Sequence, residues 1–213
     1  MGIEARRKRV KEIRRQAILK AARKLFFEKG FKNVTVESIA KKADISKGAV
    51  YLHFKSKEEI YAQILLSDVE RHHLIMSGLM KSGKSATETL MILSQSYIDF
   101  FLNDRELFRI LMNYMLHTEH MNLPEEMDKE IVKAVNRNMD MVLEGFKMGI
   151  ESGEFPPFMN LFLNRNAVWG LLNGAISLHL FTGPESKREE RIRSTIREGM
   201  EIYLTGLKKS MQT

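Results

Sequence analysis

Apolar residues recur every three or four positions along almost the whole chain, and no segment alternates apolar and polar residues for long. This period is typical of amphipathic helices, and only four prolines interrupt it. The pattern therefore predicts an all-α protein. The expected helices cover about residues 13–28 (or 6–28), 35–43, 47–53, 57–81, 86–103, 105–117, 124–151, 161–181 and 186–209.

Residues that favour helix ends divide the first sixty positions into short helices. Gly30 is a good left-handed C-terminal cap, and Thr35 and Ser46 are good N-terminal caps for the next two helices. Ser56 and Glu59 have the spacing of a capping box, in which each side chain accepts a hydrogen bond from the other residue's backbone amide. These signals predict two short helices joined by a tight turn, followed by a long helix.

The net charge of +7 is unevenly distributed. Residues 1–57 hold 17 of the 34 Lys and Arg but only 5 of the 27 Asp and Glu, whereas residues 58–213 carry a net charge of −5. A basic block joined to a mildly acidic one indicates a module that faces nucleic acid and a body with another task. A merely solvated basic face would give the same charge, and a membrane-surface helix would need a wider apolar face.

Several function classes are disfavoured by what the 213 residues lack. Without cysteine there is no disulfide, thiol nucleophile or Cys-ligated metal, and the apolar runs are too short for a membrane span. The first residues do not have the pattern of a secretory signal. There is no P-loop, dinucleotide-binding glycine motif, nucleophile elbow or zinc-hydrolase helix, so we expect neither an enzyme nor a cofactor. His117 and His120 with Glu119 have metal-ligand spacing, but a surface loop is the better interpretation, and no metal is expected.

The segment from Thr35 to Lys57 has the order short helix, turn, short helix that defines a helix-turn-helix. In this motif the second helix enters the major groove of DNA and the first lies across it. The apolar positions that could hold both helices against the preceding one are Val34, Ile39, Ala40, Ala43, Ile45, Val50 and Phe54.

Two runs carry a resemblance to a known family: ILKAARKLFFEKGF at residues 18–31 and TVESIAKKADISKGAVYLHFKSKEEI at residues 35–60. They resemble the N-terminal DNA-binding domain of TetR-family transcriptional regulators over about residues 13–65. The resemblance implies a three-helix DNA-binding domain at residues 1–57, with a basic arm at 1–11. It also implies a larger helical ligand-binding and dimerisation domain at residues 58–213.

The resemblance also implies the residues that contact DNA. Tyr51, His53 and Lys57 fall where family members touch phosphates, and Lys47, Gly48 and Ala49 fall where they meet base edges, which suits the chemistry of these residues. The full expected set is Thr35, Ser46, Lys47, Gly48, Ala49, Tyr51, Leu52, His53, Lys55, Lys57, Arg6 and Arg9.

The basic N-terminus allows two interpretations. Arg6 and Arg9 could belong to an arm that enters the minor groove, or to a frayed terminus that only raises nonspecific affinity. The chain also departs from the family pattern at two positions. Asp44 stands where Gly is usual, which predicts a slightly strained turn, and Ala49 stands where Thr is frequent.

The last two helices are the expected dimer interface, because an operator with two half-sites needs a protein with two reading heads. Small residues at helical spacing let two backbones approach closely, and the resemblance implies a four-helix bundle made by both subunits. The same positions could instead pack within one subunit. The expected interface residues are Gly170, Gly174, Ser177, Ile192, Ile196, Met200 and Tyr203.

Thirteen of the 14 methionines lie beyond residue 57, and a Met- and Phe-rich helical body could line an adaptable apolar cavity. Plain core packing would use the same residues. The expected ligand-binding residues are Phe101, Phe108, Met112, Met141, Phe146, Trp169 and Asn173.

Together these observations predict a cytoplasmic, homodimeric transcriptional regulator, most simply a repressor. Its partners would be a palindromic double-stranded DNA operator and a small, apolar effector that releases it, with no membrane partner. Two alternatives remain at this point. One is a nonspecific DNA-organising protein, and the other is a helical small-molecule-binding protein with an incidental basic head.

Overall fold

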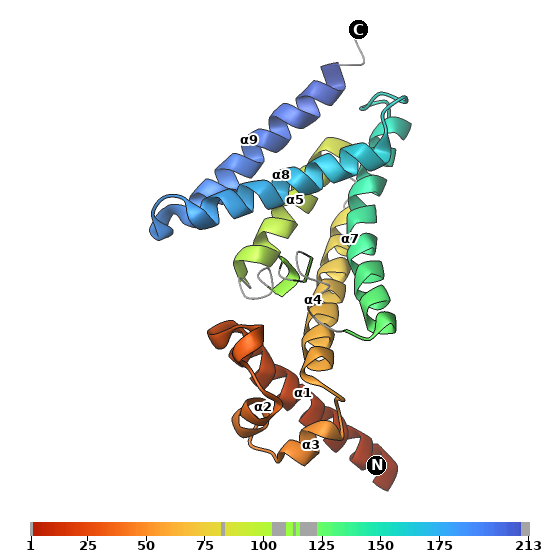
Figure 1. Ribbon diagram of the computed structural model, residues 1–213. Coiled ribbons are helices and arrows are strands. Elements are labelled where there is room, and N and C mark those ends of the chain that lie inside the picture. Colours follow the sequence, from red (N-terminus) through yellow and green to blue (C-terminus); the bar gives the residue numbers. More distant parts are fainter. Residues whose placement is uncertain (1, 82–83, 104–109, 113, 116–122, 210–213) are drawn as a thin grey trace. The chain divides into compact units, whose positions relative to one another are not determined.

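The fold is helical throughout the part of the chain that the computed structural model describes, residues 2–209 without 82–83, 104–109, 113 and 116–122. This confirms the predicted all-α class, and most helix ends lie close to their predicted positions (Figure 1). Most of the helix predicted at 105–117 lies outside the described residues. The elements are α1 (Ile3–Lys29), η1 (Phe31–Asn33), α2 (Val36–Lys42), α3 (Lys47–Tyr51), α4 (Lys57–Met80), α5 (Ala86–Asn103), α7 (Glu125–Glu151), α8 (Leu161–Phe181), η3 (Glu185–Lys187) and α9 (Arg188–Lys209).

The chain forms two compact units whose limits differ from the predicted boundary at residue 57. The first unit contains the described residues up to Asp68 and those between 106 and 132, and the second contains the rest. The reason is that the first turns of α4 pack on α1. The Tyr61 ring meets Phe26 edge-on at 5.2 Å, and Arg23 forms an ion pair with the buried Asp68. Tyr61 also donates a hydrogen bond to the backbone oxygen of Ile110.

In the first unit, α1 packs against α2, and α2 packs against α3 (Figure 1). The apolar stripe of α1 is buried as predicted, with Ile18 and Ala22 fully covered. Helix α1 begins at Ile3, so the expected basic arm is helical rather than an extended strand of chain. Its basic side chains are therefore fixed at helical spacing, which an extended arm would not provide.

The turn between α2 and α3 contains a residue with a strained backbone. Asp44 has φ of +56°, and it is the one non-glycine residue with positive φ among those the structure describes. This confirms the strain predicted from Asp at a position where the family has Gly. We expect Asp44→Gly to raise the free energy of unfolding by about 0.5–1 kcal/mol, or Tm by about 2–3 °C, because glycine adopts this conformation without a steric penalty. Thermal unfolding followed by circular dichroism would measure this.

Asparagine tolerates the same conformation as aspartate, so Asp44→Asn is the matched control and should change Tm by less than Asp44→Gly. A lower Tm for the glycine variant would show that the unfolded-state entropy of glycine outweighs the relieved strain.

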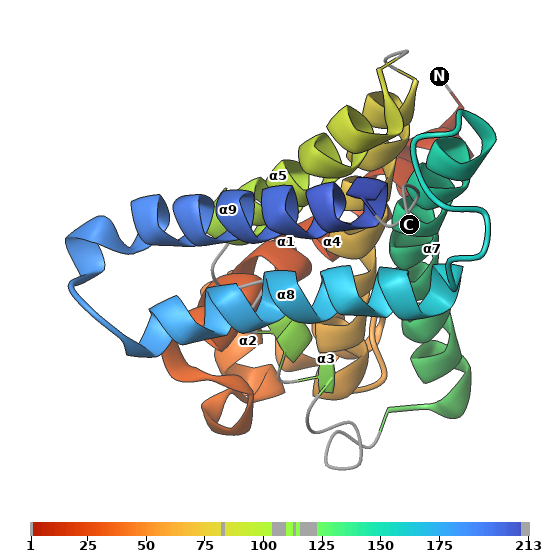
Figure 2. The same ribbon diagram turned by 90° about the horizontal axis from the view of Figure 1, so that it is seen from above.

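In the second unit, α8 and α9 lie side by side as an antiparallel pair, and α5 packs on α9 (Figure 2). The stripe of α9 formed by Ile192, Ile196 and Met200 is between 0 and 1% exposed within one chain. The prediction that these three side chains form the dimer interface is therefore wrong, because they already fill the core of their own subunit. Tyr203 is half-buried, and its hydroxyl donates a hydrogen bond to Asn164 on α8.

The other helix of this pair keeps an open apolar face. Gly170 and Gly174 are exposed, and a Cβ atom added to either would meet nothing within 4 Å, while Ser177 is half-buried. Leu163 and Leu178, which are 65% and 53% exposed, extend the same side of α8 at helical spacing. The described structure thus leaves this predicted interface stripe uncovered. None of the described helices is both long and apolar enough to cross a membrane.

Glu154, in the loop after α7, caps the start of α5 from a distant part of the sequence. Its carboxylate accepts hydrogen bonds from the backbone amides of Ala86 and Thr87, at 2.8 and 3.1 Å, and from the Thr87 hydroxyl. Partial burial alone would raise the pKa of Glu154, but these hydrogen bonds and Lys208 outweigh it and lower the pKa. The carboxylate is therefore bound more tightly in the folded protein than its protonated form.

Glu154→Gln is expected to destabilise the protein by about 1–3 kcal/mol at neutral pH, because an amide presents a donor to the amides of α5. The lowered pKa means that this contribution is fully present above the pKa of an unfolded glutamate, near 4.3, and is lost as the pH falls through the folded value. The difference in unfolding free energy between wild type and variant, measured by urea titration at several pH values, should shrink on acidification. Exposed Glu151 gives the control Glu151→Gln, for which a similar loss would mean that the cap is not responsible.

Candidate DNA-binding interface and ligand cavity

The two short helices are fixed by the caps that the sequence predicts. The Ser38 amide donates to Thr35 Oγ1, and Ser38 Oγ accepts from the Thr35 amide, both at 3.1 Å. Ser46 Oγ accepts from the Ala49 amide at 3.1 Å and so begins α3. Thr35 and Ser46 are exposed, and each uses its side-chain oxygen within the protein. Their first role is therefore to orient the two helices.

The inner side of α2 and α3 is apolar, as predicted. Val34, Ile39, Ala40, Val50 and Phe54 are at most 3% exposed. The two remaining predicted residues of this seam, at positions 43 and 45, are half-buried. The opposite side of α3 is consequently held in one orientation toward solvent.

The outer side of α3 presents the residues predicted to read DNA. Lys47 and Gly48 are exposed, Tyr51 is 49% exposed and Leu52 is 78% exposed, while Ala49 is half-buried. The helix ends at Tyr51, two residues earlier than predicted. An exposed leucine beside a tyrosine and a lysine forms a surface that can combine apolar, hydrogen-bonding and charged contacts with a duplex.

Lys55 and Lys57 lie in and just after the loop that follows α3. Lys55 is exposed, but Lys57 Nζ donates a hydrogen bond to the Phe31 carbonyl at 2.9 Å and lies 4.2 Å from the centre of that ring. One of its three ammonium protons is thus used internally, and the others remain for an anion. The capping box predicted here is half correct. The Glu59 amide donates to Ser56 Oγ at 3.2 Å, but the Glu59 carboxylate accepts from the Lys55 amide rather than from Ser56.

The N-terminal part of α1 and the end of α3 enclose a basic hollow of about 630 Å³. Burial, followed by the charges of Lys11, Arg14 and Arg15, lowers the pKa of His53 on one of its walls. His53 is half-buried, and its Nδ1 has no hydrogen-bond partner. The residues that line the hollow are Arg6, Arg7, Val10, Lys11, Arg14, Leu52 and His53.

This hollow brings together only part of the predicted basic set. Arg6 lines it and Arg9 does not, because three residues along a helix are about 300° apart around its axis. Arg7, Lys11 and Arg14 were absent from the predicted contacts. Their spacing of four and three residues, which places them on one helix face, would have identified them if the helix had been extended to residue 3.

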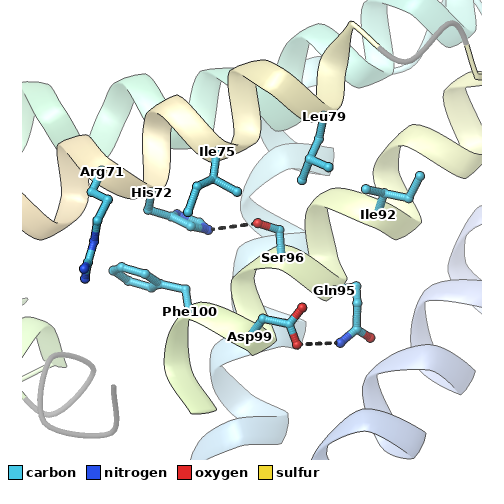
Figure 3. A pocket seen from close by; sticks show the side chains of 9 residues that line it. All are labelled: Arg71, His72, Ile75, Leu79, Ile92, Gln95, Ser96, Asp99 and Phe100. Atoms are coloured by element: carbon cyan, nitrogen blue, oxygen red, sulfur yellow. Dashed lines mark hydrogen bonds between the residues drawn. The ribbon is translucent and has the colours of Figure 1, made fainter. Parts of the chain in front are cut away.

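A second hollow, of about 540 Å³, lies between α4 and α5 in the other unit (Figure 3). His72 is 2% exposed, its Nε2 lies 3.4 Å from Ser96 Oγ, and its ring stacks on Phe100 at 4.3 Å between centroids. Its lining residues are Arg71, His72, Ile75, Leu79, Ile92, Gln95, Ser96, Asp99 and Phe100.

The predicted ligand-binding residues do not line this cavity. Phe101 and Phe146 are at most 1% exposed and belong to the core. Trp169 and Asn173 lie on Tyr97, whose hydroxyl donates to Asn173 Oδ1 at 2.8 Å. Met112 and Met141 are half-buried elsewhere, and residue Phe108 lies outside the described part of the chain, as do His117, Glu119 and His120.

Comparison with protein families places the N-terminal unit. The family model for bacterial regulatory proteins of the tetR family matches residues 18–64. An uncharacterised HTH-type transcriptional regulator of Bacillus subtilis, YerO, is 25% identical over 203 residues, which cover 92% of this chain and 66% of that protein. The fatty acid metabolism regulator protein of the same species is 26% identical over 160 residues, covering 75% of this chain and 80% of the relative.

Solved structures show the same fold over almost the entire chain. The TetR family transcriptional regulator PfmR from Thermus thermophilus has a TM-score of 0.71 and 26% identity, with 89% of this chain and 98% of that one covered. FadR from Bacillus subtilis, solved in complex with stearoyl-CoA, has a TM-score of 0.73. At 19% identity, with 90% of this chain and 98% of FadR covered, this second likeness concerns the fold alone.

Proposed function

Because this chain belongs to the tetR family of bacterial regulatory proteins, we propose that it is a homodimeric repressor that an apolar small molecule releases from a palindromic operator. The chain is a DNA-binding transcriptional regulator and not an enzyme, as its relatives are. As a repressor it would act in the cytoplasm, where its operator lies.

The observation that carries DNA reading is the exposed side of α3. Lys47, Gly48, Tyr51 and Leu52 face solvent from a helix that capping bonds and a buried apolar seam hold in place. A lysine can donate to guanine O6 and N7, and a glycine lets the backbone approach the base edges. We infer that this face enters the major groove, while Tyr51 and Lys55 contact the adjacent phosphates.

Homodimer formation is supported by the open stripe of α8. Gly170 and Gly174 allow close approach of a second helix, and Leu163 and Leu178 would be buried by it. Dimers of helix-turn-helix proteins bind half-sites about 34–36 Å apart, or a multiple of this distance. A dimer through α8 would supply the two reading heads that a palindromic operator requires.

The proposed switch is an equilibrium between two states of the dimer, of which one spaces the reading helices for successive major grooves. Helix α4 would carry the difference, because it starts six residues after α3 and continues to Met80. An effector shifts such a balance only through its differential affinity for the two states, about 5.5 kcal/mol for a complete switch. The apolar nature of the effector is supported by the relative that regulates fatty acid metabolism and by the fold shared with a stearoyl-CoA complex.

Selection from genomic DNA fragments with the purified protein at ~150 mM salt tests the proposal, since this salt concentration screens nonspecific attraction. We expect enrichment of one palindromic sequence, bound about 10³- to 10⁷-fold more tightly than random DNA. Retention of DNA without a preferred sequence would instead support a DNA-organising protein. A chain that retains no DNA in the absence of effector would contradict the regulator proposed here.

A further inference from the structure

We propose that the effector is an uncharged amphiphile, with an apolar tail and a hydroxyl or carbonyl head, bound in the cavity between α4 and α5. This proposal rests on the proposed function, which it extends by naming the site and the chemical class of the ligand. The cavity lies within one unit of the protein, and its walls come from only these two helices (Figure 3).

The shape of the cavity favours an elongated ligand. Its lining residues span positions 71–79 of α4 and 92–100 of α5, and eight residues of helix rise about 12 Å. Leu79 and Ile92 lie toward one end, whereas Arg71 and Phe100 lie toward the other (Figure 3). The volume of about 540 Å³ is that of a typical small-molecule site. An apolar tail therefore fits along the groove with its polar head at the Arg71 end.

The charges on the walls are already engaged, which disfavours a charged head. Asp99 Oδ1 accepts hydrogen bonds from Gln95 at 3.0 Å and from Arg193 of α9 at 2.7 Å. Arg193 is shared with Glu189, and the guanidinium of Arg71 is not free either. A charged head would lose hydration on entry without gaining an unpaired counter-charge.

The floor of the cavity offers neutral hydrogen-bonding groups. Burial lowers the pKa of His72 to about 4, so the ring is neutral at physiological pH. At 3.4 Å, the contact between His72 Nε2 and Ser96 Oγ is long for a hydrogen bond to a hydroxyl, which leaves both atoms able to bind a ligand oxygen. Ser96, His72 and Gln95 can thus satisfy a hydroxyl or carbonyl without any change of charge.

The same walls connect the cavity to the helices that we propose for dimerisation. Asp99 reaches Arg193 on α9, and α9 packs against α8, which bears the open glycine stripe. A ligand head that competes for Asp99 or Gln95 would alter the α5–α9 contact. This gives occupancy of the cavity a physical route to the spacing of the two subunits.

Three probes with the same ten-carbon tail test the proposal with the full-length protein: decan-1-ol, decanoate and decyltrimethylammonium. Isothermal titration calorimetry below the aggregation limit of each probe is expected to show decan-1-ol binding about tenfold more tightly than either charged probe. Decan-1-ol should also release the protein from the operator selected above. Equal or tighter binding of a charged probe would overturn the proposed ligand class.

Two tryptophan variants of neighbouring residues locate the site. Ile75, 52% exposed, lines the cavity, so Ile75→Trp should fill it and weaken decan-1-ol binding at least about tenfold. Leu74, 72% exposed, does not line it, so Leu74→Trp should bind the probe as the wild type does. Unchanged binding by Ile75→Trp, or no binding of any probe to the wild type, would refute the site.

Calorimetry also separates this proposal from the proposed function. A wild-type protein that binds decan-1-ol in an Ile75-dependent way but selects no operator would contradict the repressor and leave the cavity assignment intact. Probe binding that leaves operator affinity unchanged would overturn the effector role of the cavity.

Discussion

Gly174→Arg is expected to give a folded monomer whose operator affinity is lower by about 10²- to 10⁴-fold. The new side chain meets nothing in its own subunit, because a Cβ at Gly174 has open space around it. In the proposed dimer it would place a bulky cation between two closely packed helices, where burial of the charge is costly. Loss of the dimer removes the simultaneous binding of two half-sites, which is the source of the expected loss in affinity. Analytical ultracentrifugation and operator titration measure the two effects.

Gly78 on α4 supplies the matched control for this substitution. It is also exposed, lies within a helix and has nothing within 4 Å of an added Cβ. Gly78→Arg should therefore leave a dimer with normal operator affinity. A Gly174→Arg protein that sediments as a dimer would show that the subunits meet on another surface.

The helix-turn-helix could be predicted well because its signals are local. Thr35 and Ser46 cap helices through bonds to residues only three positions away, so the sequence alone specifies where α2 and α3 begin. The seam residue Val50 is directly followed by exposed Tyr51, which is the change of helix face that the pattern predicted. Even the strain at Asp44 followed from one residue and its expected backbone conformation.

The dimer interface was predicted only in part, because periodicity shows which side of a helix is apolar but not what covers it. The stripe through Ile192 and Ile196 is as regular as an interface stripe would be, yet α5 and α8 of the same chain cover it. Small residues carry different information. Gly170 and Gly174 contribute little to a core, and their exposure in the structure agrees with a face left open.

The ligand cavity could not be predicted for a related reason. Its walls depend on the pairing of α4 with α5, and no local signal in the sequence encodes this pairing. Phe100 lines the cavity and Phe101 lies in the core, although they are adjacent, because successive helix residues are about 100° apart. The abundance of Met and Phe identified an apolar body correctly, but the polar floor at His72 and Ser96 has no compositional signature.

The helical extension of α1 leads to the second large effect that we expect. Lys11 and Arg14 line the basic hollow beside α3, where one strand of the DNA backbone could lie next to the reading helix. Lys11→Ala/Arg14→Ala removes four cations from a homodimer. Each lost phosphate contact lowers the slope of log K against log salt by about 0.9, so the slope should flatten by about three to four. We expect the operator affinity at ~150 mM salt to fall by roughly 10²-fold.

Lys8 and Arg9 make this experiment decisive, because they carry the same charge on the same helix. Both are exposed and neither lines the hollow. Lys8→Ala/Arg9→Ala therefore removes the same four charges from the dimer while leaving the face beside α3 intact. If the basic N-terminus acts only through its net charge, the two double variants will have equal salt slopes. If the helix holds cations against the backbone, only the Lys11/Arg14 variant will show the flattened slope, since direct phosphate neutralisation releases condensed counterions and distant charge does not.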